Sequence, residues 1–125
     1  MQKEYQKIIL ITAPSGSGKT SIVKHLLKKF PLLSFSVSAT TRPPRKNEKE
    51  GKDYYFISED DFKEKIHSKE FLEWEMVYEG KYYGTLKSDI ERIWKEKKVP
   101  VLYIDVQGAI HVQQQYPVNT IAIFV

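Results

Sequence analysis

Short apolar runs alternate with amphipathic stretches along most of the chain. The run at residues 8–12 is almost continuously apolar, which is typical of a strand buried on both faces. After a glycine-rich segment, apolar residues recur at helical spacing from Ile22 to Phe30, and Pro31 ends this predicted helix. Later segments repeat the alternation. They predict strands at residues 35–39, 101–105 and 120–125, and helices at residues 86–94 and 108–116.

The middle of the chain has shorter and more polar elements. Residues 40–53, TTRPPRKNEKEGKD, are too polar and too rich in proline for a regular element, so they predict an exposed loop. The segment 54–57 is strand-like. Ser58 and the acidic Asp61 three positions later have the pattern of a helix N-cap, and the helix is expected to run to about His67.

A half-buried strand is predicted after this helix. Leu72, Trp74 and Met76 alternate with other residues of mostly polar character, which places the three on one face of a strand. The two glycines of the segment 80–84 predict a turn there.

Strands that alternate with helices indicate an α/β fold with a parallel sheet flanked by helices and crossover connections. Residues 37–86 form a smaller lobe of mixed strands and a helix, inserted into that core. The last strand is apolar, yet no helix follows to cover it. We therefore expect the 125 residues to be one domain that continues in a longer protein.

Composition excludes several classes of protein. Hydrophobic residues make up 41% and charged residues 29% of the chain, which fits a globular protein. The net charge of +4 is too small to indicate a nucleic-acid partner. There is no cysteine, which excludes disulfides and thiolate metal sites and predicts a cytoplasmic location. No stretch is long enough for a membrane span, the three histidines lack metal-ligand spacing, and nothing indicates an oligomeric state.

The segment APSGSGKT, residues 13–20, lies between the first strand and the first helix. It differs from the phosphate-binding loop G-x-x-x-x-G-K-[ST] only in having Ala13 at the first glycine position. In that context backbone N–H groups would bind phosphate oxygens, Lys19 would reach the β- and γ-phosphates, and the Thr20 hydroxyl would bind Mg²⁺. The alternative is a glycine–serine turn that caps the helix, with Lys19 in solvent. The position between strand and helix favours the nucleotide site, whose predicted residues are Pro14, Ser15, Gly16, Ser17, Gly18, Lys19 and Thr20.

Two arginines flank a pair of prolines in the polar loop, as Arg42-Pro43-Pro44-Arg45. The prolines favour a polyproline II helix, in which residues three apart project from the same side. Arg42 and Arg45 could then converge on one phosphate with planar, bidentate groups. The alternative is a solvated charged loop. Since the chain has only three arginines against seventeen lysines, the pairing favours phosphate recognition.

Together these segments resemble guanylate kinase. The matching blocks follow one another in family order: APSGSGKT, SVSATTRPPRKNEKEGKDYYF, EFLEWEMVYEGKYYGT and VLYIDVQGA. The second block is the most specific of the four. The resemblance implies a P-loop kinase that phosphorylates GMP and dGMP with ATP and Mg²⁺.

The resemblance also implies roles for individual residues. Lys19, Arg42 and Arg45 would serve catalysis, and Thr20 and Asp105 would lie at the metal. The GMP-binding residues would be Ser38, Arg42, Arg45, Glu48, Tyr54, Glu73, Tyr83 and Thr85. A carboxylate such as Glu73 can accept hydrogen bonds from the two donors on the guanine edge, which adenine lacks. Without the family pattern, Glu73 reads as a solvent-facing strand residue, and Tyr54 and Tyr83 read as packing aromatics.

The chain departs from the family pattern in three places. Ala13 replaces a glycine, and Tyr103 stands where the family often has an acidic residue. The family's lid segment, with arginines for the transferred phosphoryl group, and its C-terminal helices are not among these residues, so we expect the 125-residue chain to be a poor catalyst by itself.

Two other functions compete with guanylate kinase. A non-catalytic module of the same fold would bind phosphopeptides, but such modules usually lose the phosphate loop, which is intact here. A P-loop kinase with another acceptor is the second alternative, and the arginine pair with Glu73 favours GMP over it. A nucleic-acid-binding role ranks last.

Overall fold

The computed structural model describes residues 6–12 and 19–124. The chain divides into two compact units, each with its own sheet. Unit 1 comprises Met1–Ser36 and Ile90–Val125, and unit 2 comprises Val37–Asp89.

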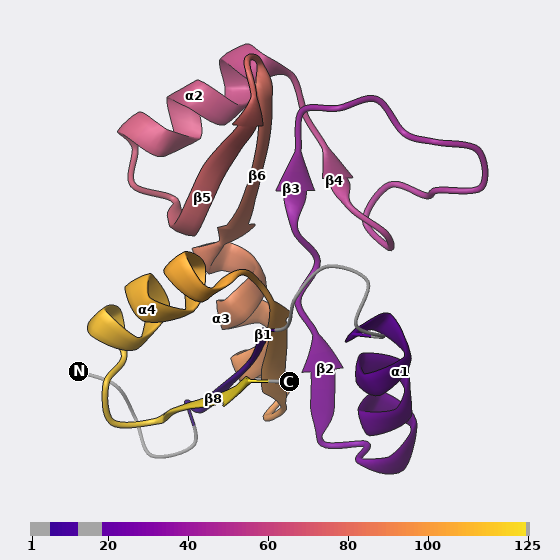
Figure 1. Ribbon diagram of the computed structural model, residues 1–125, viewed down its shortest axis with the longest axis vertical. Helices are drawn as coiled ribbons and strands as arrows, with labels where there is room; N and C mark the ends of the chain where they lie inside the picture. Colours follow the sequence, from indigo (N-terminus) through magenta and orange to yellow (C-terminus); the bar gives the residue numbers. More distant parts are fainter. Residues whose placement is uncertain (1–5, 13–18, 125) are drawn as a thin grey trace. The chain divides into compact units, whose positions relative to one another are not determined.

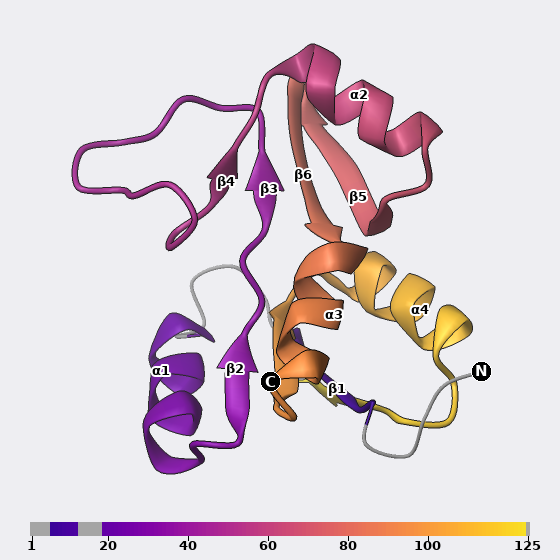
Figure 2. The ribbon, with the colours of Figure 1, turned by 180° about the vertical axis from the view of Figure 1, so that it is seen from behind.

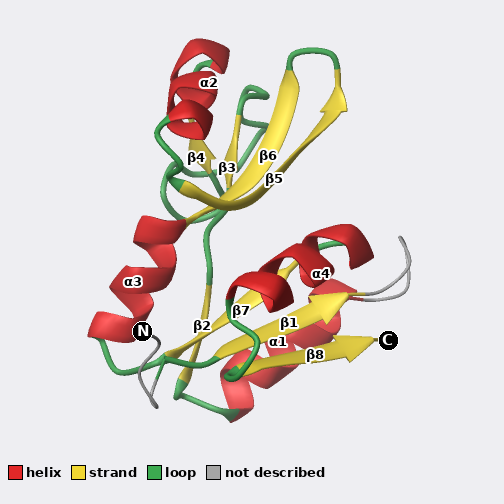
Figure 3. Cartoon of the chain, turned by 90° about the vertical axis from the view of Figure 1, so that its left-hand side faces the viewer, coloured by secondary structure: helices red, strands yellow, loops and turns green. Residues whose placement is uncertain are grey.

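Unit 1 contains a four-stranded parallel sheet with strand order β2-β7-β1-β8, whose strands are labelled in Figure 3 and whose helices α1, α3 and α4 are labelled in Figure 1. The strands are β1 (Ile8–Thr12), β2 (Leu33–Phe35), β7 (Val99–Tyr103) and β8 (Thr120–Phe124). The helices are α1 (Lys19–Lys29) and α4 (Val106–Gln115), and α3 (Lys87–Lys95) begins in unit 2 and continues into unit 1. The predicted α/β fold with a parallel sheet and flanking helices is confirmed.

Helices lie on both faces of this sheet (Figure 3), so the central strands β1 and β7 are largely buried, whereas Ile121, Ile123 and Phe124 of β8 are exposed. On one face Ile11, Val23 and Val101 form a buried cluster, against which Leu26 and Leu27 of α1 pack. On the other face α4 contacts β1 and β8. There Trp94 of α3 packs edge-to-face on Tyr116, with ring centroids 5.7 Å apart. This double burial explains the apolar runs of β1 and β7.

Unit 2 contains a mixed sheet with strand order β4-β3-β6-β5 and the helix α2 (Figure 2). Its elements are β3 (Ala39–Thr40), β4 (Tyr55–Phe56), α2 (Glu59–His67), β5 (Phe71–Tyr78) and β6 (Lys81–Leu86). Strand β3 is parallel to β4 and antiparallel to β6, and β5 and β6 form an antiparallel hairpin. The core of this unit consists of Ala39, Phe62, Phe71 and Leu86.

Helix α2 supplies the centre of that core. Its N-cap is Ser58, whose Oγ accepts a hydrogen bond from the Asp61 backbone N–H at 3.0 Å, so the predicted N-cap is confirmed. Phe62 is fully buried, and its ring stacks on Phe71 of β5 at 4.3 Å between centroids. The helix therefore covers one face of the sheet and leaves the other face for polar side chains.

Three predictions about elements were wrong in detail. Residues 35–39 are not one strand: β2 ends at Phe35 in the parallel sheet and β3 begins at Ala39 in the mixed sheet. Residues 80–84 are not a turn, because the chain turns at Glu79 and Gly80 and β6 starts at Lys81. The strand at 71–78 is buried only at its start: Leu72 is buried, but Trp74 and Met76 are 45% and 52% exposed.

Within residues 6–12 and 19–124, no helix is both long enough and apolar enough to cross a bilayer.

Candidate functional site

The loop between β3 and β4 is braced by its own carboxylates. The Glu48 carboxylate accepts a hydrogen bond from the Arg45 backbone N–H at 2.7 Å. Asp53 accepts one from the Lys49 N–H at 2.7 Å, and Glu50 accepts one from Phe56 at 2.8 Å. These bonds satisfy backbone donors that no sheet reaches, which gives a polar, proline-containing segment a defined conformation. The loop predicted from the polar stretch is thus present and ordered by local pairs.

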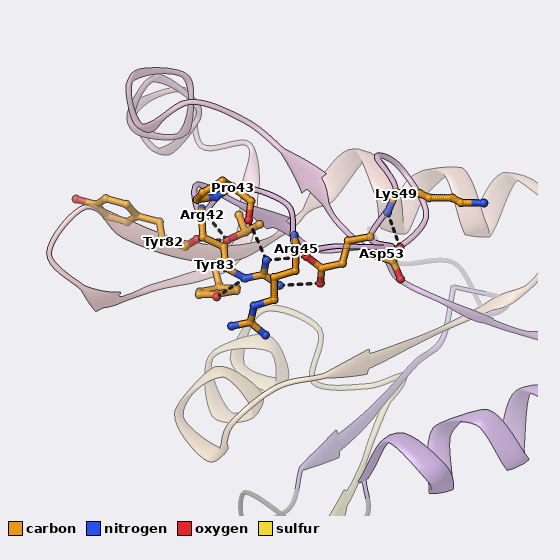
Figure 4. Close-up of polar contacts among 9 residues, drawn as sticks. Arg42, Pro43, Arg45, Lys49, Asp53, Tyr82 and Tyr83 are labelled. Atoms are coloured by element: carbon orange, nitrogen blue, oxygen red, sulfur yellow. Dashed lines mark hydrogen bonds and ion pairs between the residues drawn. The ribbon is translucent and has the colours of Figure 1, made fainter.

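The Arg42 side chain donates four hydrogen bonds to protein groups. Its Nη1 and Nη2 donate to the two oxygens of Glu48 at 2.7 and 2.9 Å, so the ion pair is bidentate. Nη1 also donates to the Pro43 carbonyl at 3.1 Å, and Nε donates to the Tyr83 hydroxyl at 3.1 Å (Figure 4). A guanidinium has five N–H donors. Four are therefore engaged within the described part of the chain, and one is left there without a partner.

The ion pair shifts the titration of both partners. The pKa of Glu48 falls to about 2, first because its carboxylate accepts hydrogen bonds from Arg42 and then because it accepts one from the Arg45 backbone. The pKa of Arg42 rises above its ordinary value, chiefly through the hydrogen bonds to Glu48. Glu48 is therefore ionised at neutral pH and holds Arg42 in place.

Arg45 differs from Arg42 in its side-chain contacts. Within residues 6–12 and 19–124, the Arg45 guanidinium and the Tyr54 hydroxyl form no hydrogen bond or ion pair, and Arg45 is exposed. All five guanidinium donors of Arg45 are thus available. The two predicted arginines lie in the same loop beside Glu48, but they do not act as an equivalent pair: one is fixed by protein groups and the other is free for an anion.

Two tyrosines complete this cluster on the sheet face opposite α2. The Arg42 guanidinium lies over the Tyr54 ring at 5.0 Å from its centroid. The Tyr54 and Tyr83 rings meet edge-to-face at 6.0 Å. Their neighbours Tyr55 and Tyr82 pack on the core instead, because successive strand residues point to opposite faces. Strand alternation therefore explains why one tyrosine of each adjacent pair reaches Arg42.

Glu73 and Thr85 are directly opposite each other on β5 and β6. The Thr85 hydroxyl donates to Glu73 Oε1 at 3.3 Å, and Thr85 is buried while Glu73 is half-buried. Ser38 precedes β3, and its carbonyl accepts a hydrogen bond from the Tyr55 N–H at 2.8 Å. Of the eight predicted acceptor residues, Arg42, Glu48, Tyr54 and Tyr83 form one contact network, and Glu73 and Thr85 form a second contact pair.

The predicted phosphate loop lies mostly outside the described residues. This holds for Ala13 and for Pro14, Ser15, Gly16, Ser17 and Gly18. Lys19 and Thr20 are the first residues of α1, which follows β1 through this loop, and their side chains are also outside the described part. The strand–loop–helix order that the motif requires is present.

Asp105 lies at the N-terminus of α4. It is not the last residue of a strand, as the sequence suggested, since β7 ends at Tyr103. Its Oδ1 accepts a hydrogen bond from the Gly108 N–H at 2.8 Å, which makes Asp105 the N-cap. Among the described residues, no three histidine, cysteine, aspartate or glutamate side chains are grouped to hold a metal ion. Tyr103 packs edge-to-face on Phe35, so this position serves the core of unit 1.

Sequence reasoning missed Thr41, which joins the loop to the hairpin. Its Oγ1 donates to the Gly80 carbonyl at 2.9 Å and accepts from the Tyr82 N–H at 2.9 Å. Thr41 directly precedes Arg42, so these two hydrogen bonds hold the start of the loop against the hairpin that carries Tyr83. Its position as the second of two threonines immediately before the arginine was the available signal.

A parallel sheet whose first strand leads through a glycine-rich sequence into a helix, together with a separate arginine–tyrosine cluster, is typical of the P-loop class of α/β proteins. Comparison with known proteins is more specific. The family model described as guanylate kinase matches residues 5–125. The chain belongs to the guanylate kinase family, which confirms the resemblance inferred from the sequence.

Individual relatives agree with this assignment. The chain is 48% identical over 120 residues to a guanylate kinase of Porphyromonas gingivalis, covering 95% of this chain and 64% of that protein. It is 50% identical over 119 residues to one of Thermotoga maritima, covering 95% and 56%. The crystal structure of guanylate kinase from Anaplasma phagocytophilum matches with a TM-score of 0.76 at 31% identity, covering 94% of this chain and 58% of that one. The chain thus spans roughly three fifths of the length of these relatives.

Proposed function

We propose that this protein transfers the terminal phosphoryl group of ATP to GMP or dGMP, and that unit 2 is the lobe that binds the acceptor. The observation that carries the proposal is the cluster around Arg42. Arg42 is oriented by Glu48 and Tyr83, while the Arg45 guanidinium and the Tyr54 hydroxyl beside it have open donors. A phosphate monoester is the ligand that such converging donors suit.

Arg45 is the main phosphate ligand in this proposal. Among the residues that the structure describes, its five guanidinium N–H donors have no partner, and Arg42 contributes the one donor that Glu48, Tyr83 and Pro43 leave open. Tyr54 adds its hydroxyl. Glu48 holds Arg42 in place and does not meet the phosphate, since two negative charges would repel each other.

Glu73, Thr85 and Ser38 would recognise the base. The Glu73 carboxylate accepts the two hydrogen bonds that the guanine N1–H and 2-amino groups offer. Thr85 holds this carboxylate from the opposite strand. Adenine has no such donors on that edge, so the half-buried Glu73 carboxylate would gain no hydrogen bond from that base, which selects for guanine.

Transfer itself depends on positioning and positive charge. An oxygen of the acceptor phosphate is the nucleophile, so no protein base is needed. The loop 14–18 with Lys19 and Thr20 would bind the ATP phosphates, and Thr20 and Asp105 would hold Mg²⁺. The Asp105 carboxylate is exposed, and only its Oδ1 has a partner among the described residues, so Oδ2 is an oxygen ligand of the kind that Mg²⁺ prefers. When bound, Mg²⁺ neutralises charge on the phosphates. The cysteine-free composition supports a cytoplasmic location.

Calorimetric titration of the folded chain with GMP and with AMP tests the proposal. We expect GMP to bind and AMP to bind at least about a hundredfold more weakly, because adenine offers no hydrogen-bond donors to the Glu73 carboxylate. Arg45→Ala should weaken GMP binding by about tenfold or more without changing the melting temperature. Arg92→Ala is the matched control, since Arg92 of α3 is exposed and pairs with Glu96, which follows the helix.

A folded chain that ignores GMP would overturn the proposal. Binding of a phosphorylated peptide in its place would favour the non-catalytic module, and equal affinity for AMP would favour a kinase with another acceptor.

A further inference from the structure

One buried carboxylate of unit 2 belongs neither to the loop nor to the base contacts. Asp89 is only 3% exposed and lies in the first turn of α3. Its Oδ1 accepts a hydrogen bond from the Tyr55 hydroxyl at 2.6 Å, and its Oδ2 accepts one from the Val37 backbone N–H at 2.8 Å. Val37 and Asp89 are the first and last residues of unit 2. The carboxylate therefore joins the two ends of the unit and also reaches its edge strand β4.

The contact with Tyr55 is linked to the arginine cluster through the neighbouring residue Tyr54. Tyr55 lies in β4 with its side chain on the core side, and its N–H donates to the Ser38 carbonyl at 2.8 Å. Tyr54 precedes it and points to the opposite face, where its ring packs on Arg42 and Tyr83. Fixing the Tyr55 side chain fixes the rotation of this short strand. The position of the Tyr54 ring follows from that rotation.

The contact with Val37 acts on the other strand. A hydrogen bond to the Val37 N–H holds the backbone one residue before Ser38, whose carbonyl is already bound by β4. One carboxylate thus restrains both segments that carry predicted acceptor contacts. Strands β3 and β4 have only two residues each, so their ladder alone gives little rigidity.

We propose that Asp89 is a positioning residue for the acceptor site, acting through Tyr55 and Val37 on Tyr54, Arg42 and Ser38. This inference rests on the proposed function, because it assumes that these residues bind GMP. A purely structural role would make Asp89 important for stability alone. The two roles differ in a measurable way, since positioning predicts a loss of GMP affinity beyond that caused by an equal loss of stability.

Three substitutions and one control separate these roles by GMP titration. Asp89→Ala removes both bonds and Tyr55→Phe removes one, and we expect GMP to bind about tenfold and about fivefold more weakly. Asp89→Asn keeps the shape, accepts from Val37 through its oxygen and donates to the Tyr55 hydroxyl, so it should restore affinity to within about threefold. Phe62→Leu destabilises the same unit from its core and should leave GMP affinity unchanged.

A second readout does not need GMP. The three arginines give three Nε–H signals in a spectrum of ¹⁵N-labelled protein, and the Arg42 signal is assigned by its loss in Arg42→Lys. The Arg42 Nε–H donates to Tyr83, so its exchange with water should be slow. In Asp89→Ala and Tyr55→Phe we expect this signal to shift and to exchange about tenfold faster, with no change in Phe62→Leu.

The outcomes are distinct. If wild-type protein fails to bind GMP, the proposed function fails, and the Arg42 signal still decides whether Asp89 positions the cluster. Unchanged GMP affinity and an unchanged Arg42 signal in the folded Asp89 and Tyr55 variants would overturn the inference, as would equal effects in Phe62→Leu. If Asp89→Ala does not fold, Tyr55→Phe and Asp89→Asn carry the decision.

Discussion

At the scale of single residues, Arg42 and Arg45 have the same side chain in the same loop but different contacts. Arg42 has four of its donors occupied by Glu48, Tyr83 and Pro43, whereas Arg45 has none of its guanidinium donors occupied within the described residues. A fixed arginine loses little conformational entropy when a ligand binds, but it has few open donors. A free arginine has more open donors and loses more conformational entropy on binding. The sequence spacing of three residues predicted two equivalent arginines. The side-chain contacts of Arg42 with Glu48, Tyr83 and Pro43 distinguish the two.

Glu48 should make the stability of this loop depend on pH. Its pKa is about 2 in the folded protein against an ordinary 4.5, so the folded state favours the ionised form. The stability that Glu48 contributes is then complete above pH 4.5 and is lost as the pH falls towards 2. We expect the difference in melting temperature between wild type and Glu48→Gln to shrink over this range. A difference in melting temperature that stays constant for Glu48→Gln over this range would contradict the argument.

At the scale of elements, the sequence predicted which segments are regular better than where they join. The run from Phe35 to Ala39 is apolar at alternate positions, and nothing in that pattern marks the change from one sheet to the other. The two glycines at 80 and 84 look alike in the sequence, but only Gly80 turns the chain, with φ +78°. Hydrophobic periodicity indicates that one face of a strand is buried. It does not indicate which sheet the strand belongs to.

Gly84 is needed for a close approach between strands, and this makes a prediction. A Cβ at Gly84 would lie 2.8 Å from Phe71 Cδ1 and 2.9 Å from Trp74 Cβ on β5. Gly84→Ala should therefore force the hairpin apart and lower the free energy of unfolding by about 1–3 kcal/mol in denaturant titrations. Ser88→Ala, at an exposed position of α3, is the control and should change it little. An unchanged unfolding midpoint for Gly84→Ala would show that the strands can separate at no cost.

At the scale of the whole molecule, the sequence predicted the α/β class, the family and the residues of the arginine cluster. It did so because these depend on local patterns: apolar runs, a glycine-rich loop and arginines close to prolines. The network of Asp89 was not predictable in this way. Its partners Tyr55 and Val37 are 34 and 52 residues away, and an isolated aspartate on a helix has no sequence signal that points to either.

The chain has three arginines to distribute over the whole reaction. Arg42 is held by Glu48 and Tyr83, Arg45 is proposed to bind the acceptor phosphate, and Arg92 of α3 forms an exposed pair with Glu96 just after the helix. None of the three is then left to neutralise charge on the phosphoryl group in transit. Lys19 is the cation proposed for the donor phosphates.

These 125 residues should consequently bind GMP but transfer phosphoryl groups slowly. An arginine that stabilises transition-state charge contributes about 10³–10⁵ to kcat, so we expect a turnover far below the roughly 1–100 s⁻¹ of ordinary kinases. The measurement is ADP formation from ATP and GMP in a coupled assay, with the GMP titration on the same sample as proof that the acceptor site is intact. Lys19→Ala gives the background rate. Turnover at an ordinary kinase rate would show that Lys19 and Mg²⁺ suffice, and the requirement for a further arginine would be withdrawn.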